Sequence, residues 1–198
     1  MSAALFPIPP TNILPYSGEA ILYADMFPQA ESDVIFAQLI TETTWKQEPI
    51  KMFGKLVMQP RLTACYGEKS IIYSGIEMPP LPWTNLLLTL KQRVEQIAQV
   101  QFNSVLLNYY RDGKDSMGWH RDNEKELGHR PVIASVSFGA ERKFALRNYI
   151  SKMDAVSVSL AHGSLLLMRG DTQHIWEHSV PKVKFAQPRL NLTFRVVQ

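Results

Sequence analysis

The second half of the chain consists of short apolar or alternating segments with turn residues between them, and no other feature limits the possible folds as strongly. Alternation with a period of two is typical of strands that bury one face. Many short strands in close succession predict a β-sandwich or a jelly roll over about residues 102–198. The segments are FNSVLLNYY, PVIASVSFG, KFALRN, AVSVSL, GSLLLMR, IWEHSV and RLNLTFRVV.

Two helices are expected before this region. Residues 31–45 and 83–100 place apolar side chains at helical spacing, with Ser32 and Thr84 as the expected N-caps. About residues 1–20 are rich in proline, which opposes a helix, and are expected to form an extended arm. The 198 residues are therefore expected to form a single domain, mainly β with flanking helices (α+β).

The composition indicates a globular protein of a reducing compartment. Apolar residues make up 45% of the chain, while the formal charge of +3 is only a weak sign of a polyanionic partner. Cys65 is the single cysteine, so an internal disulfide is excluded. The first residues lack the pattern of a signal peptide, and no run is long enough to cross a membrane. We expect a soluble intracellular monomer, cytoplasmic in a bacterium or nuclear in a eukaryote.

The segment GWHRDNE places His120 and Asp122 two positions apart. In an extended segment these side chains point the same way and could share a metal ion. His178 is the favoured third ligand because it lies eleven residues before Arg189 and would end a strand beside the one that carries this arginine. His174 has the same strand parity and is the second choice. The remaining candidates are His129 and His162.

The last alternating segment, RLNLTFRVV, separates an apolar face from a polar one. The polar face, which either contacts solvent or lines the mouth of a barrel and holds an anion, consists of Arg189, Asn191, Thr193 and Arg195. Asn108 and Tyr110 have the same spacing on another extended segment and would add an amide and a phenol. The sequence leaves both interpretations of the polar face open.

Two imidazoles and one carboxylate are the ligand set typical of non-haem Fe(II), with three coordination positions left open. A 2-oxo acid could occupy two of these positions and dioxygen the third. The far carboxylate of such a co-substrate needs a forked cation, and Arg189 and Arg195 are available. The alternative is a structural zinc site in a non-catalytic module that binds nucleic acid. Such sites favour cysteine, which occurs once here.

Several of these motifs together resemble the AlkB family of Fe(II)- and 2-oxoglutarate-dependent dioxygenases that dealkylate nucleic acids. The resemblance rests on His120, Asp122 and His178, followed by RLNLTFR and preceded by NYY, in the order found in that family. The stretch SVSFGAERKFALR is also similar to a signature of the family. The similarity runs from about residue 50 to the C-terminus.

The resemblance implies a double-stranded β-helix (jelly-roll) core that holds Fe(II) and uses 2-oxoglutarate and O2 as co-substrates. The implied metal ligands are His120, Asp122 and His178. The residues implied to bind the far carboxylate of 2-oxoglutarate are Arg189, Tyr110 and Asn191, and those nearer the metal are Arg195 and Asn108. The implied reaction forms succinate and CO2, hydroxylates an N-alkyl carbon and releases formaldehyde from a methylated base.

Residues of about 50–80 are expected to form a nucleotide-recognition lobe. The stretch IKMFGKLVMQPRLTACYGEKSIIYSG resembles the corresponding region of animal AlkB-type enzymes that repair duplex DNA. There, Phe53 between Lys51 and Lys55 would fill the stack left by an extruded base while the lysines meet phosphates. The alternative is a hairpin in which Phe53 packs inward.

The same resemblance suggests how a damaged base would be held. Tyr73 would stack on the base, although the relatives have phenylalanine or tryptophan there and Tyr66 is an alternative. Glu124 would contact the exocyclic amino group, and Arg61 and Arg142 would contact phosphates at the pocket mouth.

The expected function is DNA repair by removal of methyl groups from 1-methyladenine and 3-methylcytosine in duplex and single-stranded DNA. RNA or a protein side chain is the alternative substrate for the same iron chemistry.

Overall fold

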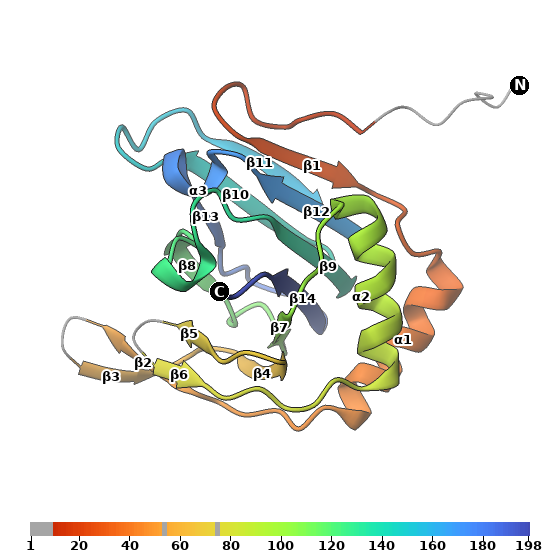
Figure 1. Cartoon of the computed structure of the whole chain (residues 1–198). Helices are drawn as coiled ribbons and strands as arrows, with labels where there is room; N and C mark the ends of the chain where they lie inside the picture. Colours follow the sequence, from red (N-terminus) through yellow and green to blue (C-terminus); the bar gives the residue numbers. More distant parts are fainter. Residues whose placement is uncertain (1–9, 53–54, 74–75) are drawn as a thin grey trace, which may run out of the picture.

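The computed structural model describes residues 10–52, 55–73 and 76–198, which form two antiparallel sheets that face each other (Figure 1). The larger sheet has six strands, each antiparallel to its neighbours. Their order is β1 (Glu19–Tyr23), β12 (Ser164–Arg169), β9 (Ile133–Gly139), β14 (Arg189–Arg195), β7 (Ser104–Tyr110) and β4 (Leu62–Gly67).

The smaller sheet has four strands, in the order β11 (Val156–Leu160), β10 (Arg142–Asn148), β13 (Trp176–Val180) and β8 (Met117–His120). Each of the seven segments expected to be extended overlaps one of the strands β7 and β9 to β14, so these predictions are confirmed. Three strands of these sheets, β1, β4 and β8, were not among the seven, and β4 lies in the stretch expected to form the recognition lobe. β8 is short and lacks alternation, and β1 lies partly in the expected arm.

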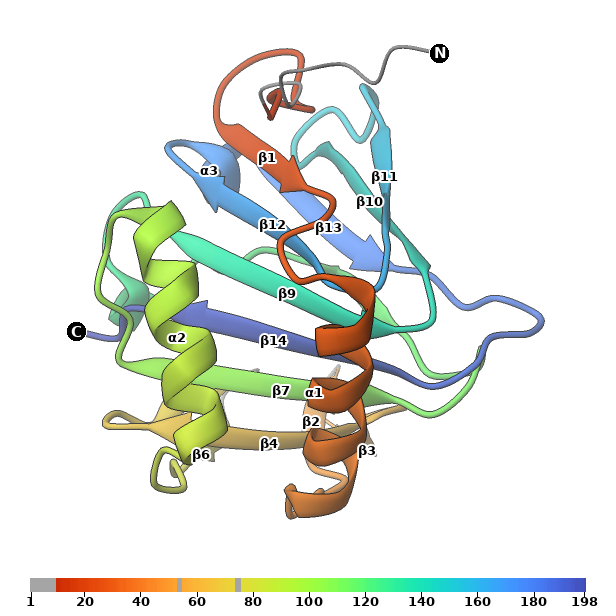
Figure 2. The same ribbon diagram turned by 90° about the vertical axis from the view of Figure 1, so that its right-hand side faces the viewer.

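Two helices, α1 (Gln29–Glu42) and α2 (Asn85–Ala98), lie across the outer face of the larger sheet (Figure 2). Thr84 caps α2 as expected, since its side chain accepts a hydrogen bond from the Leu87 N–H at 3.2 Å. The expected Ser32 cap is wrong, because α1 already begins after Pro28 and Ser32 is a buried residue inside it. The Ser32 hydroxyl donates to the Phe27 carbonyl at 3.1 Å instead.

Strand β14 lies between the two hydrophobic layers and faces both. Leu190, Leu192 and Phe194 are fully buried in the core shared with the helices. The polar residues of the other face point between the two sheets, and all seven residues of the strand are buried. The half-solvated interpretation of this strand is therefore wrong, and the polar face lines an interior cavity.

Two hairpins precede α2 and lie together beside the larger sheet (Figure 1). They pair β2 (Pro49–Met52) with β3 (Lys55–Met58), and β5 (Ile71–Tyr73) with β6 (Ile76–Met78). The facing sheets and the two packed helices confirm the expected class, mainly β with flanking helices. No helix in the described ranges is long and apolar enough to cross a membrane.

Candidate active site

Two strands of the smaller sheet bring His120 and His178 together. His120 ends β8, His178 lies in the middle of β13, and the two residues are directly opposite each other in the antiparallel register. Their ring centroids are 4.3 Å apart. Asp122 follows two residues after β8, and the possible ligand atoms of the three side chains all lie within 4.8 Å of one another. Two imidazoles and a carboxylate at this spacing can hold one metal ion.

The other histidines that the sequence offered lie elsewhere. His162 accepts a hydrogen bond from the Gly139 N–H at 2.7 Å, on the helix side of the larger sheet. His174 belongs to the short helix α3 (Thr172–Ile175), and its ring lies 5.0 Å from that of His129. Among the residues whose placement is described, His120, Asp122 and His178 form the only group of three or more possible metal ligands.

The protonation states of the three side chains suit a metal. Burial alone would raise the pKa of Asp122, but the charge of Arg195 and the two histidines outweigh it and lower this pKa to about 2. Burial, with a contribution from His120, lowers the pKa of His178 to about 3, and burial also lowers the pKa of His120. At neutral pH the triad therefore offers a carboxylate and two neutral imidazoles, which are the forms that bind metal ions.

Hydrogen bonds and ring contacts orient the ligands. The Nδ1 of His120 lies 2.9 Å from the Gly118 carbonyl, a contact that places the proton on Nδ1 and leaves the Nε2 lone pair for a metal. The ring of Phe144 stacks on His178 with centroids 5.1 Å apart. Arg195 donates from Nη2 to Asp122 Oδ1 at 2.9 Å, with both side chains buried.

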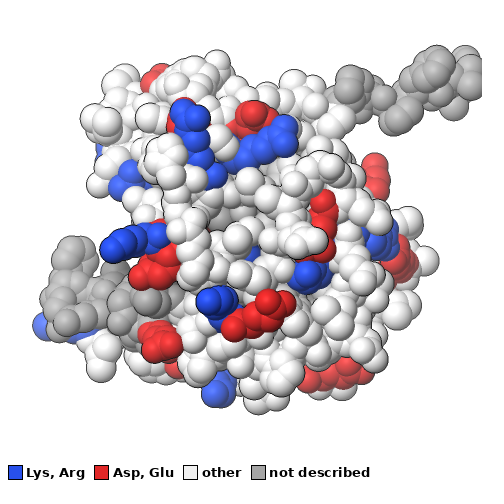
Figure 3. Space-filling model, viewed as in Figure 1, with Lys and Arg blue, Asp and Glu red and all other residues white. Residues whose placement is uncertain are grey.

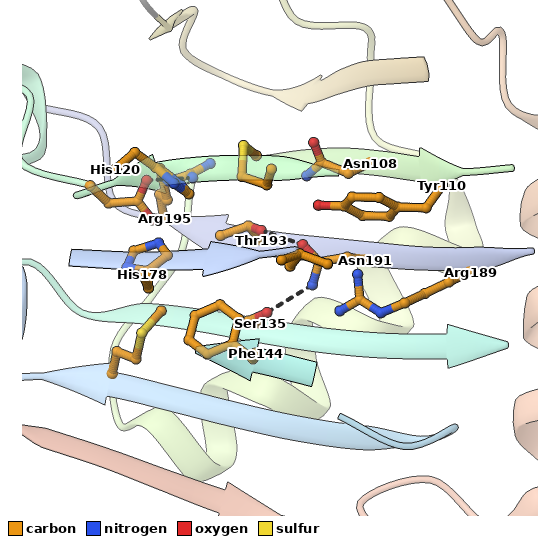
Figure 4. A pocket seen from close by; sticks show the side chains of 14 residues that line it. Asn108, Tyr110, His120, Ser135, Phe144, His178, Arg189, Asn191, Thr193 and Arg195 are labelled. Atoms are coloured by element: carbon orange, nitrogen blue, oxygen red, sulfur yellow. Dashed lines mark hydrogen bonds and ion pairs between the residues drawn. The ribbon is translucent and has the colours of Figure 1, made fainter. Parts of the chain in front are cut away.

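The far end of the same cavity holds a buried arginine (Figure 4). Arg189 is 1% exposed and donates from Nη2 to the Ser137 hydroxyl at 2.9 Å. Its Nε and Nη1 have no hydrogen-bond partner within the described part of the chain, and its guanidinium carbon lies 5.1 Å from the centre of the Tyr110 ring. A buried guanidinium is costly unless an anion pairs with it, so this end of the cavity is suited to a carboxylate.

A metal triad at one end of a cavity and an unneutralised arginine at the other fit a metal-bound dicarboxylate. The sequence model of the 2OG-Fe(II) oxygenase superfamily matches residues 19–195. The chain belongs to this superfamily. The superfamily's name implies Fe(II), 2-oxoglutarate and O2, and the residues of the cavity fit this set.

Relatives within the superfamily place the chain with the AlkB-type dioxygenases. It is 46% identical to the alpha-ketoglutarate-dependent dioxygenase alkB homolog 3 of Mus musculus, over 89% of this chain and 65% of that protein. It is 41% identical to the DNA oxidative demethylase ALKBH2 of Bos taurus, over 88% of this chain and 68% of that protein. The chain thus spans slightly less than two thirds of the length of the alkB homolog 3 relative.

A solved structure shares the fold of this AlkB-type chain. The structure of OsALKBH1 superposes with a TM-score of 0.65 and 19% sequence identity, and the match covers 89% of this chain and 97% of the other. The predicted jelly-roll core is therefore confirmed at the level of the fold.

Asn108 and Asn191 both line the cavity of this AlkB-type chain, but only one of the two amides has hydrogens left for a ligand. The Asn191 amide nitrogen donates to the Ser135 hydroxyl at 2.7 Å and to the Val136 carbonyl at 3.1 Å, so both of its hydrogens are used. Asn108 accepts from Arg61 Nε through Oδ1 at 2.7 Å. This contact keeps the amide oxygen of Asn108 occupied and its NH2 group available to the cavity.

Arg61 and Arg142 are not at the pocket mouth, where contacts to phosphates were expected. Arg61 is 2% exposed and Arg142 is 3% exposed. The Arg142 guanidinium donates to the carbonyls of Asp112, Asp115 and Pro181, at 3.3, 3.0 and 2.7 Å. Both arginines are held inside the protein by their partners, so the predicted surface role is wrong for this arrangement.

The structure describes the side chains of only some of the residues that were expected to contact a base. Glu124 is half-buried near the triad, where burial and the neighbouring Asp122 raise its pKa. Tyr66 is buried in the core that contacts the helices, so it is not at hand for stacking in the cavity. Phe53 lies outside the described residues. For Tyr73 the structure gives the backbone position in β5 but not the side chain.

Sequence reasoning missed several cavity residues and the partner of the Asp122 backbone. The additional lining residues are Met117, Ser135, Phe144, Met168 and Val180. Alternation placed Thr193 on the polar face of β14, and it could also have found Ser135, which shares a face of β9 with Ser137. The partner of the Asp122 N–H is Gln173, on α3, and no spacing rule connects these two segments.

The surface shown in Figure 3 carries lysine and arginine side chains among aspartate and glutamate side chains. This mixture agrees with the small net charge of +3. Because both signs of charge are mixed on this face, it has no broad positive potential that would attract a polyanion. Binding of a polyanion here would depend on individual lysine and arginine side chains.

Proposed function

We propose that this chain is an Fe(II)- and 2-oxoglutarate-dependent dioxygenase that demethylates 1-methyladenine and 3-methylcytosine in DNA. The observation that carries the proposal is the single cavity with the His120, Asp122 and His178 triad at one end and the unpaired charge of Arg189 at the other. The choice of DNA is supported by the relative named DNA oxidative demethylase ALKBH2.

In this proposal the triad holds the iron, and Arg189, Tyr110 and Asn108 hold the co-substrate. Arg189, with Tyr110 beside it, pairs with the far carboxylate of 2-oxoglutarate, while Asn108 donates its amide hydrogens nearer the metal. Arg195 keeps the Asp122 carboxylate ionised and oriented. When bound, the iron and 2-oxoglutarate supply an oxidation by O2 that yields succinate and CO2 and removes the methyl carbon as formaldehyde.

The base would enter beside the triad and meet the half-buried Glu124. A carboxylate suits both lesions, because 1-methyladenine and 3-methylcytosine are positively charged and present an exocyclic amino group. We further propose that Tyr73 stacks on the base and that the Phe53 tip enters the duplex, as the resemblance implies. Exposed Leu56 and Met58 on β3, 72% and 51% exposed, support a hairpin that faces a partner.

We propose the same organisation for the whole chain as the sequence suggested: one domain, with an arm of about residues 1–20, a recognition lobe of about residues 50–80 and a jelly-roll core of about residues 102–198. A DNA substrate implies action inside the cell, in the nucleus of a eukaryote or the cytoplasm of a bacterium. We also propose that the protein acts as a monomer.

The direct test uses purified protein loaded with Fe(II) under nitrogen and then exposed to air with 2-oxoglutarate. Oligonucleotides with one 1-methyladenine or 3-methylcytosine, single-stranded or paired, are analysed by mass spectrometry, and formaldehyde and succinate are measured. We expect loss of the methyl group with one formaldehyde per base, and none with Asp122→Ala. Succinate without demethylation would point to another substrate; neither product would reject the proposal.

A further inference from the structure

Asp122 is held differently from the two histidines of the triad. His120 and His178 lie in paired strands, so the ladder between β8 and β13 fixes their backbones. β8 ends at His120, and Asp122 lies beyond it in a segment without regular structure. The backbone of the carboxylate ligand therefore needs another partner to stay in place.

That partner is Gln173 in α3. Gln173 has no exposed surface, and its Oε1 accepts a hydrogen bond from the Asp122 N–H at 2.9 Å. A second bond ties the same loop to the same helix, since Arg121 Nη1 donates to the His174 carbonyl at 3.1 Å. Because α3 leads directly into β13, these bonds connect the loop of Asp122 to the strand of His178.

The surroundings of Gln173 fix which way its amide points. Its Nε2 donates to the thioether sulfur of Met168 at 3.7 Å. A thioether accepts only weakly and cannot donate, so the amide oxygen is the group directed at the Asp122 N–H. The helix itself is anchored, since the buried Thr172 hydroxyl accepts from the Glu19 N–H at 2.9 Å and lies 2.6 Å from the Arg169 carbonyl.

We propose that Gln173 is a positioning residue that holds the Asp122 backbone so that the carboxylate faces the two histidines before the metal arrives. The inference rests on the proposed function only in taking the triad as the metal site. Arg195 restrains one carboxylate oxygen from the side-chain end, and Gln173 restrains the other end of the residue through its N–H. Loss of the Gln173 bond leaves a buried N–H without an acceptor, and the loop must move to reach water.

The test measures binding of Mn(II) by electron paramagnetic resonance, without 2-oxoglutarate or DNA. Gln173→Met keeps the side-chain length but removes the acceptor, and Gln173→Asn keeps the amide but is too short to reach. We expect both to bind Mn(II) about 10- to 100-fold more weakly, the loss typical when a group that orients a metal ligand is removed. Gln173→Glu retains an acceptor at the same place and is expected to restore binding.

Arg130→Met is the matched control, because it removes an exposed ion pair to Asp171, next to α3, and leaves the acceptor of the Asp122 N–H in place. We expect it to bind Mn(II) as the unaltered protein does. A second measurement follows hydrogen exchange of the Asp122 amide by NMR in the metal-free protein. Exchange should accelerate in Gln173→Met and Gln173→Asn, while the amide of His178 in β13 keeps its rate.

Unchanged Mn(II) affinity in Gln173→Met would overturn the inference even if the enzyme demethylates DNA. If Gln173→Met does not fold, Gln173→Asn is compared with Gln173→Glu instead. Equal Mn(II) affinities of these two variants would reject the positioning role. Because no DNA or co-substrate is present, an enzyme that fails to demethylate can still show the expected loss of Mn(II) affinity.

Discussion

Arg189 is a charged residue whose surroundings are incomplete without an anion. Its guanidinium is buried with two nitrogens unpaired among the described residues, and the nearby Arg142 adds a like charge. An isolated buried charge is destabilising, and binding sites commonly retain such a cost because the ligand needs the charge. Stability and co-substrate binding should therefore respond in opposite directions when this residue is changed.

We expect Arg189→Met to leave the ligand-free protein as stable as before or about 1 kcal/mol more stable, because an uncompensated buried charge is removed. The same change should abolish stabilisation by 2-oxoglutarate. Urea unfolding with and without 2-oxoglutarate measures both effects, and Arg169→Met, at an exposed ion pair with Glu19, is the control. Large destabilisation of the ligand-free protein would contradict this account of Arg189.

Arg61 illustrates a residue whose role changes once its neighbours are known. Its Nε holds the Asn108 oxygen, so it decides which end of that amide faces the cavity. We expect Arg61→Met to raise the KM for 2-oxoglutarate by about tenfold, the equivalent of one hydrogen bond of roughly 1.4 kcal/mol. Affinity for Mn(II) alone should not change, because Asn108 is not one of the three ligands. Steady-state kinetics with varied 2-oxoglutarate and a Mn(II) titration separate the two effects.

At the scale of single elements, alternation predicted the strands well but could not tell what covers them. RLNLTFR shows the same pattern whether its polar face meets solvent or a second sheet, because the period of two fixes only which side chains share a face. The answer depends on β8, β10 and β13, which pack over it from other parts of the chain. The sequence therefore predicted that the polar residues share one face, but not whether solvent or a second sheet covers that face.

The buried arginines mark another limit of prediction from sequence. Arg142 lies in β10, and its partners are main-chain carbonyls of two loops that are distant in sequence. Carbonyl acceptors are present at every residue, so no residue pattern announces them. The hydrogen bond from the Asp122 N–H to Gln173 in α3 could not be predicted either, because no sequence spacing relates a glutamine on a short helix to a distant loop.

We expect Arg142→Met to lower the free energy of unfolding by about 2–3 kcal/mol, because the carbonyls of Asp112, Asp115 and Pro181 lose their donor, and the one at Asp115 is buried. The neighbouring Lys143→Met, on the exposed face of the same strand, should change stability by no more than about 0.5 kcal/mol. Urea unfolding monitored by tryptophan fluorescence provides both numbers. Equal effects of the two substitutions would contradict the structural role of Arg142.

The β2 and β3 hairpin is the element whose role is most specific to the DNA proposal. Replacing Phe53 by alanine should reduce demethylation of duplex DNA while leaving single-stranded DNA nearly unaffected, because only a duplex needs its stack filled when a base is extruded. The measurement is the initial rate on matched single and paired oligonucleotides. Val34→Ala, at an exposed apolar residue of α1 outside the hairpin, controls for a general loss of apolar surface. Parallel losses on both substrates would remove the wedge from the mechanism.

For the whole molecule, the cavity joins the two sheets. Asn108, Tyr110 and Arg189 come from the larger sheet, while His120 and His178 come from the smaller one. A metal with a bound dicarboxylate would connect the sheets through a small number of strong contacts. Ligand binding should consequently stabilise the fold as a unit, since a ligand that binds only the native state shifts the unfolding equilibrium.

Mn(II) and 2-oxoglutarate, each at about 100 times its dissociation constant, should add about 2.7 kcal/mol apiece to stability. For a domain of this size that corresponds to a rise in Tm of about 5–10 °C for each ligand. We expect 2-oxoglutarate to act fully only when Mn(II) is present, because the metal supplies one end of its binding site. Scanning fluorimetry should show no shift by either ligand in Asp122→Ala, whereas Arg189→Met should retain the shift by Mn(II) and lose the shift by 2-oxoglutarate. A full 2-oxoglutarate shift in Asp122→Ala would mean that the dicarboxylate binds away from the triad, and the two ends of the cavity would not form one site.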